Sequence, residues 1–318
     1  MRVRPPTVLT GMTVGVALNA SDTLNQVDAT VELAREAAAA GLRSAWFGQT
    51  FDADSPQLAA IVGREVPGLH VGTSAIPVFG RHPLLVSSQA QTAQAATHGR
   101  YHLGLALGTK LLTETGFGLP FARPIALLRE FLTALRQLTQ TGTADFHGEL
   151  LTAATPFPAR VPGAENGVPL LVAAMGPQSL RVSGELADGI LPYLAGPRAL
   201  AEHIVPALTA AAEAAGRPAP RIVALVSGVV TDDVETVRTK VAEQLAFYEQ
   251  IPSYARVIEL SGGRRAADVA VIGDERTVAA ETRRYRDAGA SEVVFSGTEI
   301  AGEADRRRTW ALLGELAG

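Results

Sequence analysis

Residues 69–110 read LHVGTSAIPVFGRHPLLVSSQAQTAQAATHGRYHLGLALGTK and contain one complete strand–helix–strand unit. An apolar run at 70–78, dense in small and β-branched residues, is typical of a buried strand. Pro83 suits the first turn of a helix, where its missing N–H is not needed, and Gly99 suits the left-handed conformation that ends a helix. A second buried strand is predicted at 101–107. The polar residues that follow each strand are therefore the first candidates for a site.

The same alternation of apolar strands and amphipathic helices continues on both sides of this unit. Eight strands are predicted, at 12–18, 44–47, 70–78, 101–107, 168–174, 189–192, 221–229 and 292–295. Irregular insertions are expected at about 141–167, which includes a hairpin, and at about 251–274. Eight strands with intervening helices favour an α/β protein with one (β/α)8 TIM barrel domain over residues 1–318. A doubly wound open sheet is the alternative, but the turn after the first strand lacks the glycines of a dinucleotide-binding fingerprint.

The composition excludes several classes of protein. The 318 residues include no cysteine, which excludes disulfides, thiolate metal sites and a cysteine nucleophile. The net charge is −4 with no basic stripe, and aromatic residues make up only 5% of the chain, so we expect no nucleic-acid partner. No stretch reaches the roughly 18 apolar residues of a membrane span, so we expect no membrane partner.

The N-terminal residues 1–21 allow two interpretations. A basic start, an apolar middle and a small-residue end outline a secretory signal peptide. Two threonines and two glycines at 10–15 interrupt the apolar part, and a first strand at 12–18 accounts for it as well. We favour the strand and therefore expect a cytoplasmic protein.

Three common catalytic motifs are missing. The run GLALGTK at 104–110 lacks the spacing and the Gly-Lys-Ser/Thr end of a phosphate-binding P-loop. No Gly-x-Ser-x-Gly elbow occurs, so a hydrolase serine has no support. The six histidines are scattered without the HExxH spacing or a carboxylate partner, and we expect no metal site.

Two strand ends nevertheless carry residues that suit a ligand. Met175, Gly176 and Pro177 follow a buried strand, where glycine lets a ligand approach the backbone and the next helix offers free N–H groups to an anion. Arg81 precedes the helix at Pro83 and suits a phosphate. A plain strand-to-helix turn and a solvated loop arginine are the alternatives at these two places.

Seven segments together resemble the bacterial luciferase-like flavin superfamily, and within it the oxidoreductases that use the deazaflavin coenzyme F420. The resemblance covers nearly the whole chain and lies in the order and spacing of the segments. They are WFGQ (46–49), VGTSAIPVFGRHP (71–83), GRYHLGLALG (99–108), FHGE (146–149), VPLLVAAMGP (168–177), GELADG (184–189) and IGDERTVAAETRRYRDAGA (272–290).

The resemblance implies a cofactor site at the strand ends. The third strand of the family ends in a bulge with a non-prolyl cis peptide that supports the flat ring from behind, and Ser74-Ala75 is the matching pair. The turn at Ala174, Met175, Gly176 and Pro177 matches the segment that holds the phosphate side of the coenzyme. The cofactor-binding set that we predict is Ser74, Ala75, Arg81, Gly108, Ala174, Met175, Gly176 and Pro177.

The candidate catalytic residues are Gln49, Thr109 and Lys110. Gln49 and Thr109 match positions beside the ring in the family, and Lys110 would donate a proton or bind an acidic substrate, with an exposed loop lysine as the alternative. Members that oxidise sugar phosphates have a histidine after strand two and a glutamate after strand four. Thr50 and Thr109 stand at those positions here, which argues against sugar-phosphate oxidation.

The resemblance therefore implies an F420-dependent oxidoreductase that reduces an activated C=C or C=N bond of a small organic or natural-product substrate by hydride transfer. An FMN-dependent two-component monooxygenase is the first alternative, and a non-catalytic flavin-binding barrel is the second. We also expect a homodimer.

Overall fold

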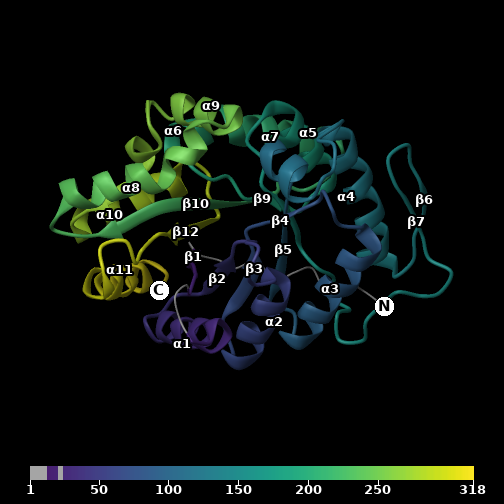
Figure 1. The fold of residues 1–318 in the computed structure, drawn as a ribbon, viewed down its shortest axis with the longest axis horizontal. Helices are drawn as coiled ribbons and strands as arrows, with labels where there is room; N and C mark the ends of the chain where they lie inside the picture. Colours follow the sequence, from purple (N-terminus) through teal and green to yellow (C-terminus); the bar gives the residue numbers. More distant parts are fainter. Residues whose placement is uncertain (1–12, 21–23) are drawn as a thin grey trace.

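The apolar runs predicted as strands are strands in the computed structural model, which describes residues 13–20 and 24–318. The barrel strands are β1 (Thr13–Ala17), β2 (Ser44–Phe47), β3 (His70–Thr73), β5 (Tyr101–Ala106), β8 (Leu170–Val172), β9 (Gly189–Ile190), β10 (Arg221–Val230) and β12 (Glu292–Ser296). Each pairs with its neighbours in parallel, and β10 pairs with both β9 and β12, which closes the ring (Figure 1). The predicted (β/α)8 barrel is confirmed.

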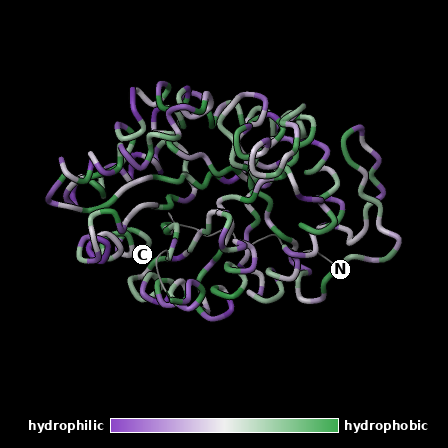
Figure 2. Tube along the Cα trace, in the orientation of Figure 1, coloured by the Kyte–Doolittle hydropathy of each residue, from purple (hydrophilic) through white to green (hydrophobic). Residues whose placement is uncertain are grey.

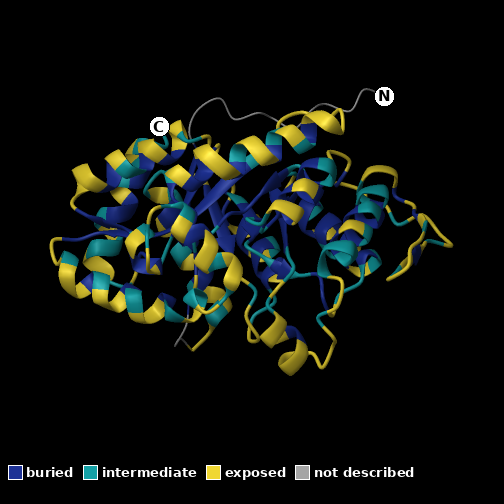
Figure 3. Cartoon of the chain, turned by 90° about the horizontal axis from the view of Figure 1, so that it is seen from above, coloured by how far each residue is buried: buried dark blue, intermediate teal, exposed yellow. Residues whose placement is uncertain are grey.

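Helices surround this ring and bury one face against it (Figure 3). They are α1 (Gln26–Ala39), α2 (Ser55–Glu65), α3 (Pro83–Ala96), α4 (Pro124–Thr141), α5 (Pro177–Leu186), α6 (Pro197–Ala199), α7 (Val205–Ala214), α8 (Val234–Glu249), α9 (Pro252–Leu260), α10 (Glu275–Asp287) and α11 (Glu303–Leu316). Figure 2 shows mostly hydrophobic strands and helices of mixed hydropathy. No helix in the described ranges is both long and apolar enough to span a bilayer.

The helix ends follow the local sequence. Asn25 caps α1 by accepting hydrogen bonds from the N–H groups of Val27 and Asp28, and Asp54 caps α2 in the same way. Gly41 and Gly99 follow α1 and α3 with φ of 94° and 86°, a conformation that glycine adopts without steric cost.

The structure differs from the predicted elements in three places. The third predicted strand is divided into β3 and β4 (Ile76–Pro77) by a cis peptide between Ser74 and Ala75. The sequence predicts one continuous helix at 197–215, and a π-helical turn at Leu200–Ile204 divides it into α6 and α7. The segment 251–274 is not irregular: it forms α9, a 3-10 turn and β11 (Val271–Gly273), and β11 pairs with the C-terminal part of β10.

The other insertion contains the hairpin that the sequence predicts. Strands β6 (Asp145–His147) and β7 (Thr152–Ala154) pair antiparallel and project away from the barrel (Figure 1). The basic start on which the signal-peptide alternative depends lies in residues 1–12, outside the described residues.

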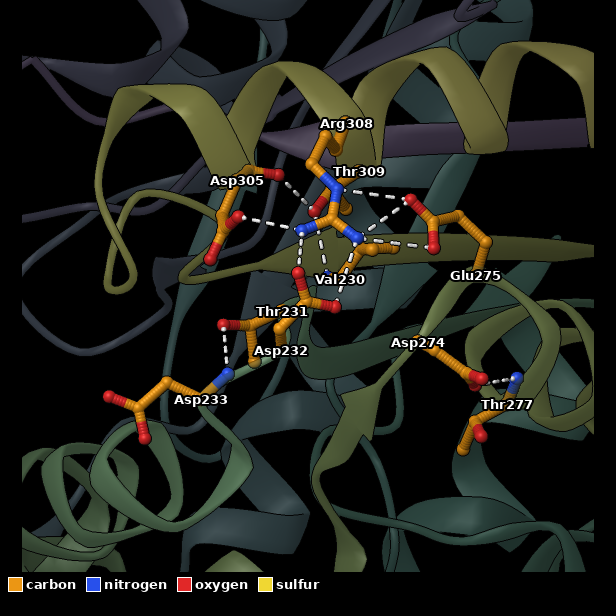
Figure 4. A network of polar contacts seen from close by, with 10 residues as sticks. All are labelled: Val230, Thr231, Asp232, Asp233, Asp274, Glu275, Thr277, Asp305, Arg308 and Thr309. Carbon is orange, nitrogen blue, oxygen red and sulfur yellow. Dashed lines mark hydrogen bonds and ion pairs between the residues drawn. The ribbon is translucent and has the colours of Figure 1, made fainter.

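Arg308 of α11 connects three segments at the C-terminal side of β10 (Figure 4). Its Nη1 donates to Asp232 at 3.1 Å and to Asp305 at 3.2 Å, and its Nε donates to Glu275 at 3.0 Å. The neighbouring Thr309 hydroxyl accepts from the last N–H of β10 at 2.8 Å. These contacts hold α11 to the strand end and to α10.

A polar cluster closes the opposite end of the barrel, where the strands begin. We call it the basal network, and it consists of Ser44, His70, His102, Arg221 and Glu292. The Glu292 carboxylate is buried, accepts from Trp46 Nε1 and from Arg221 Nη2 at 2.9 Å each, and also accepts from Ser44. His102 lies 3.2 Å from His70 between ring nitrogens and stacks on Trp46. The network therefore fixes the indole that fills the barrel centre.

The two histidines of the basal network predict a pH-dependent stability. Burial holds the pKa of His102 well below the ordinary 6.5, with a smaller contribution from Arg221, and burial also lowers the pKa of His70. Both rings therefore bind a proton less readily in the folded protein than in the unfolded chain, which protonates them as the pH falls through 6.5. Stability is full above this pH and is lost below it, by up to about 1.4 kcal/mol per pH unit for His102.

Urea unfolding between pH 7.5 and pH 5.5 measures this loss. We expect the free energy of unfolding to decline less steeply in His102→Gln than in the wild type. The control is His147→Gln, which removes an exposed histidine of the hairpin, outside the basal network. Equal slopes for His102→Gln and the wild type would show that His102 binds protons equally well in the folded and the unfolded protein.

Candidate functional site

Small residues form half of the barrel floor at the carboxyl ends of the strands. Trp46, Leu171 and Val294 fill the middle of the barrel, and the residues two positions later lie one layer higher, because side chains alternate along a strand. Ala173 and Gly48 stand two positions after Leu171 and Trp46 and lie in this upper layer. Ala17 at the end of β1 and Ala75 after β3 also pack against the central cluster. The floor on the side of β1, β2, β3 and β8 therefore consists of small residues.

Glycines beneath the floor make room for the indole. A Cβ on Gly72 would lie 2.5 Å from the Trp46 ring, and a Cβ on Gly104 would lie 1.9 Å from the carbonyl oxygen of Thr73 and 2.5 Å from Leu191. Trp46 is consequently completely buried. The close approach of β3 and β5 at Gly104 depends on the absence of a side chain there.

The cis peptide predicted at Ser74-Ala75 is confirmed. Ser74 donates its N–H to the Phe47 carbonyl at 2.8 Å, and Ala75 packs on the central cluster. The chain resumes as β4, which pairs with β5 at Ile76 and Leu105. This bulge places Ala75 on the small half of the floor.

Gln49 and Arg81 lie together, although they are 32 residues apart. Arg81 Nη2 donates to Gln49 Oε1 at 3.2 Å. The same oxygen accepts from the N–H and the hydroxyl of Ser55, while Gln49 Nε2 donates to the carbonyls of Thr50 and Ala53. The amide is thus engaged within the protein, so Gln49 positions Arg81 at the rim and organises the loop after β2.

The loop after β5 places the next candidates at the rim. Gly108 has φ of 72°, and the Thr109 hydroxyl accepts from the N–H of Leu112 at 3.2 Å, which starts a π-helical turn at Leu112–Gly116. Lys110 is exposed. The hydroxyl of Thr109 is occupied by the backbone, and a role of either side chain in the chemistry stays a prediction.

The turn after β8 leaves space at the start of α5. Ala174 is buried, Met175 and Gly176 are half-buried, and Pro177 is exposed. Gly176 precedes the helix without a side-chain cap, and a Cβ there would meet only the Ser179 hydroxyl, at 3.8 Å. The first N–H groups of α5 and the open space above Gly176 suit an anionic group.

Hydroxyl groups form the other half of the floor, and we did not predict them from the sequence. They belong to Tyr193, Ser227 and Ser296, each two positions after a residue of the central cluster on β9, β10 or β12. The signal was available, because Tyr193 and Ser296 directly follow predicted buried strands and Ser227 lies near the end of one, each in the inward-facing register. Among the described residues of this layer, no inward-facing side chain is charged.

Comparison with known proteins identifies the family. A model of the luciferase-like monooxygenase family matches residues 7–292. An F420-dependent glucose-6-phosphate dehydrogenase of Rhodococcus jostii is 29% identical over 257 residues, which cover 74% of this chain and 75% of the relative.

Two solved structures share the fold. The coenzyme F420-dependent tetrahydromethanopterin reductase of Methanopyrus kandleri has a TM-score of 0.76 at 21% identity, covering 96% of this chain and 98% of that protein. The oxygenating constituent of 3,6-diketocamphane monooxygenase from Pseudomonas putida, in complex with FMN, has a TM-score of 0.76 at 15% identity, covering 97% and 98%. From the family match over most of its length, this chain belongs to the luciferase-like monooxygenase family.

Proposed function

We propose that this protein is an oxidoreductase that binds the deazaflavin coenzyme F420 and transfers hydride to an activated C=C or C=N bond. The observation that carries the proposal is the divided floor. Its alanine half, with the Ser74-Ala75 bulge, carries small side chains against which a planar ring could lie. The deazaflavin supplies a hydride and reacts slowly with oxygen, while the chain supplies position and exclusion of water.

The remaining predicted residues fit the rest of such a coenzyme. The open space above Gly176 would take the phosphate side, next to the first N–H groups of α5. Arg81, held by Gln49, and Gly108 stand at the rim on the side of β4 and β5. F420-dependent relatives among the similar proteins support this choice of coenzyme.

The residues at the rim also favour the direction of the reaction. Oxidation of an alcohol needs a base that accepts the hydroxyl proton, and Thr50 and Thr109 occupy the loops where a histidine and a glutamate would serve. A threonine hydroxyl does not accept a proton near neutral pH. The site is therefore better suited to reduction than to sugar-phosphate oxidation.

A turnover experiment tests this proposal. Reduced F420 should be oxidised by the protein in the presence of cyclohex-2-en-1-one, under conditions without oxygen, whereas glucose 6-phosphate should not reduce the oxidised coenzyme. Reduction of F420 by the sugar phosphate, with no reaction of the enone, would contradict the proposed direction.

An FMN-dependent monooxygenase is the second candidate, because a structural neighbour binds FMN on the same fold. Reduced FMN together with oxygen would then consume the substrate, and the F420 reaction would not occur. A homodimer stays a prediction, which sedimentation of the purified protein decides.

A further inference from the structure

Tyr193 stands on the hydroxyl half of the floor, opposite the alanines. It follows β9 and pairs with Leu225 of β10, and its side chain packs on the cluster that fills the barrel centre. Leu191, two positions earlier, belongs to that cluster. The register therefore directs the phenol to the inside of the barrel, at the level where a ligand on the floor would lie.

Two other tyrosines fix the orientation of this ring. Tyr248 at the end of α8 meets the Tyr193 ring edge-on, with centroids 5.3 Å apart, and Tyr254 of α9 does so at 6.2 Å. Edge-to-face contacts of this kind are favourable for aromatic rings. The segment 251–274 thus contributes to the site through α9, which supports Tyr193 from behind.

The Ser296 side chain at the end of β12 lies beside the Tyr193 hydroxyl. Ser296 Oγ donates to the Val226 carbonyl at 3.3 Å. The phenolic O–H rotates about its C–O bond, so its proton can turn from the serine oxygen to the acceptor atom of a ligand on the floor. Burial raises the pKa of Tyr193, so the group stays a neutral donor over the working pH range.

The surroundings restrict what that donor can bind. No inward-facing side chain of the floor is charged in the described part of the chain. The two loops above the alanine half carry exposed apolar side chains, with Phe51 73%, Leu111 55% and Phe117 43% exposed. Phe51 and Phe117 contact each other across these loops, with centroids 6.2 Å apart. A charged substrate would lose its hydration at this entrance without gaining an ionic partner on the floor.

From these contacts we infer that Tyr193, held by Ser296, Tyr248 and Tyr254, donates a hydrogen bond to the acceptor atom of an uncharged, largely apolar substrate. The acceptor is either the carbonyl oxygen conjugated with the C=C bond that is reduced, or the nitrogen of the C=N bond that is reduced. This hydrogen bond would withdraw electron density from the carbon that receives hydride, and a proton from solvent would complete the reduction at the neighbouring carbon of the C=C bond or at the imine nitrogen. The inference rests on the proposed function for its chemistry, and it adds the substrate class and the residue that recognises it.

Binding without coenzyme tests the inference independently of turnover. Acetophenone serves as the uncharged carbonyl probe and benzoate as its charged counterpart, with affinity measured by calorimetry and the carbonyl stretch by infrared difference spectroscopy. The wild type should bind acetophenone more tightly than benzoate and shift the stretch to lower wavenumber. Tyr193→Phe should lose the shift and bind acetophenone about two- to tenfold more weakly, the usual effect of one hydrogen bond.

Tyr285→Phe is the matched control, because it removes the hydroxyl of another buried tyrosine, which packs in the main core on α10 and does not contact Tyr193. It should retain the shift and the affinity, and both variants should melt close to the wild type. Equal binding by Tyr193→Phe, tighter binding of benzoate, or no binding of acetophenone up to its solubility limit would overturn the inference. If the carbonyl stretch shifted in a Tyr193-dependent way but the protein never oxidised reduced F420, the proposed function would be contradicted and the donor role of Tyr193 would stand.

Discussion

Replacement of Glu292 by alanine is expected to lower the free energy of unfolding by about 3 kcal/mol, because it leaves a buried N–H unsatisfied and removes a charge-assisted hydrogen bond. The carboxylate is 2% exposed and accepts from Ser44, from Trp46 and from Arg221, whose side chain is 37% exposed. Its removal leaves the Trp46 N–H without a partner and the Arg221 guanidinium without its counter-charge. The loss should be visible in urea unfolding followed by tryptophan fluorescence, since Trp46 contacts the network directly.

The control is an exposed glutamate that also pairs with an arginine. Glu32 contacts Arg35 on α1 with its side chain 67% exposed, and Glu32→Ala should cost less than about 1 kcal/mol. If the two variants lost similar free energy, the basal network would not hold the barrel centre.

The same substitution at two glycines should separate folding from coenzyme binding. Gly104→Val places a Cβ 1.9 Å from a backbone oxygen of β3, which cannot move without opening the strand pair. We expect a loss of about 3 kcal/mol or more, at the upper end of the cost of overpacking a core. Thermal unfolding followed by circular dichroism measures this loss.

Gly176→Val is the counterpart, because its Cβ meets only a hydroxyl at 3.8 Å and the backbone there is extended. This variant should melt near the wild type and bind coenzyme at least about tenfold more weakly, since the branched side chain fills the space proposed for the phosphate side. Unchanged affinity would show that the turn after β8 does not approach the coenzyme. A stable Gly104→Val protein would contradict the packing of the barrel interior.

The barrel was predictable because its strands are short apolar runs bounded by turn residues. The bounds of β2 agree with the predicted strand at 44–47 to the residue, and α2 agrees with a helix that the sequence predicts from Ser55 or Pro56 to about Glu65. The segment 251–274 was not predictable as α9 and β11. Gly262 and Gly263 suggested a loop, whereas Pro252 and the buried pair Val257 and Ile258 decide the helix once α8 is in place.

The sequence predicted the candidate site only in segments that belong to a recognisable motif. The bulge at Ser74-Ala75 and the turn at Gly176 belong to motifs with characteristic spacing. Tyr193 and Ser296 belong to no motif, because their roles come from barrel register and from a contact between strand ends 103 residues apart in the sequence numbering. Such contacts form when the sheet closes into a barrel, and a local sequence pattern does not predict them.

The most direct test of the central claim is a titration of the protein with coenzyme F420 and with FMN, each followed by quenching of intrinsic tryptophan fluorescence. From the proposed function we expect that F420 binds more tightly than FMN, and from the turn at Gly176 we expect that Gly176→Val weakens the binding of F420. Tighter binding of FMN than of F420 would contradict the proposed coenzyme.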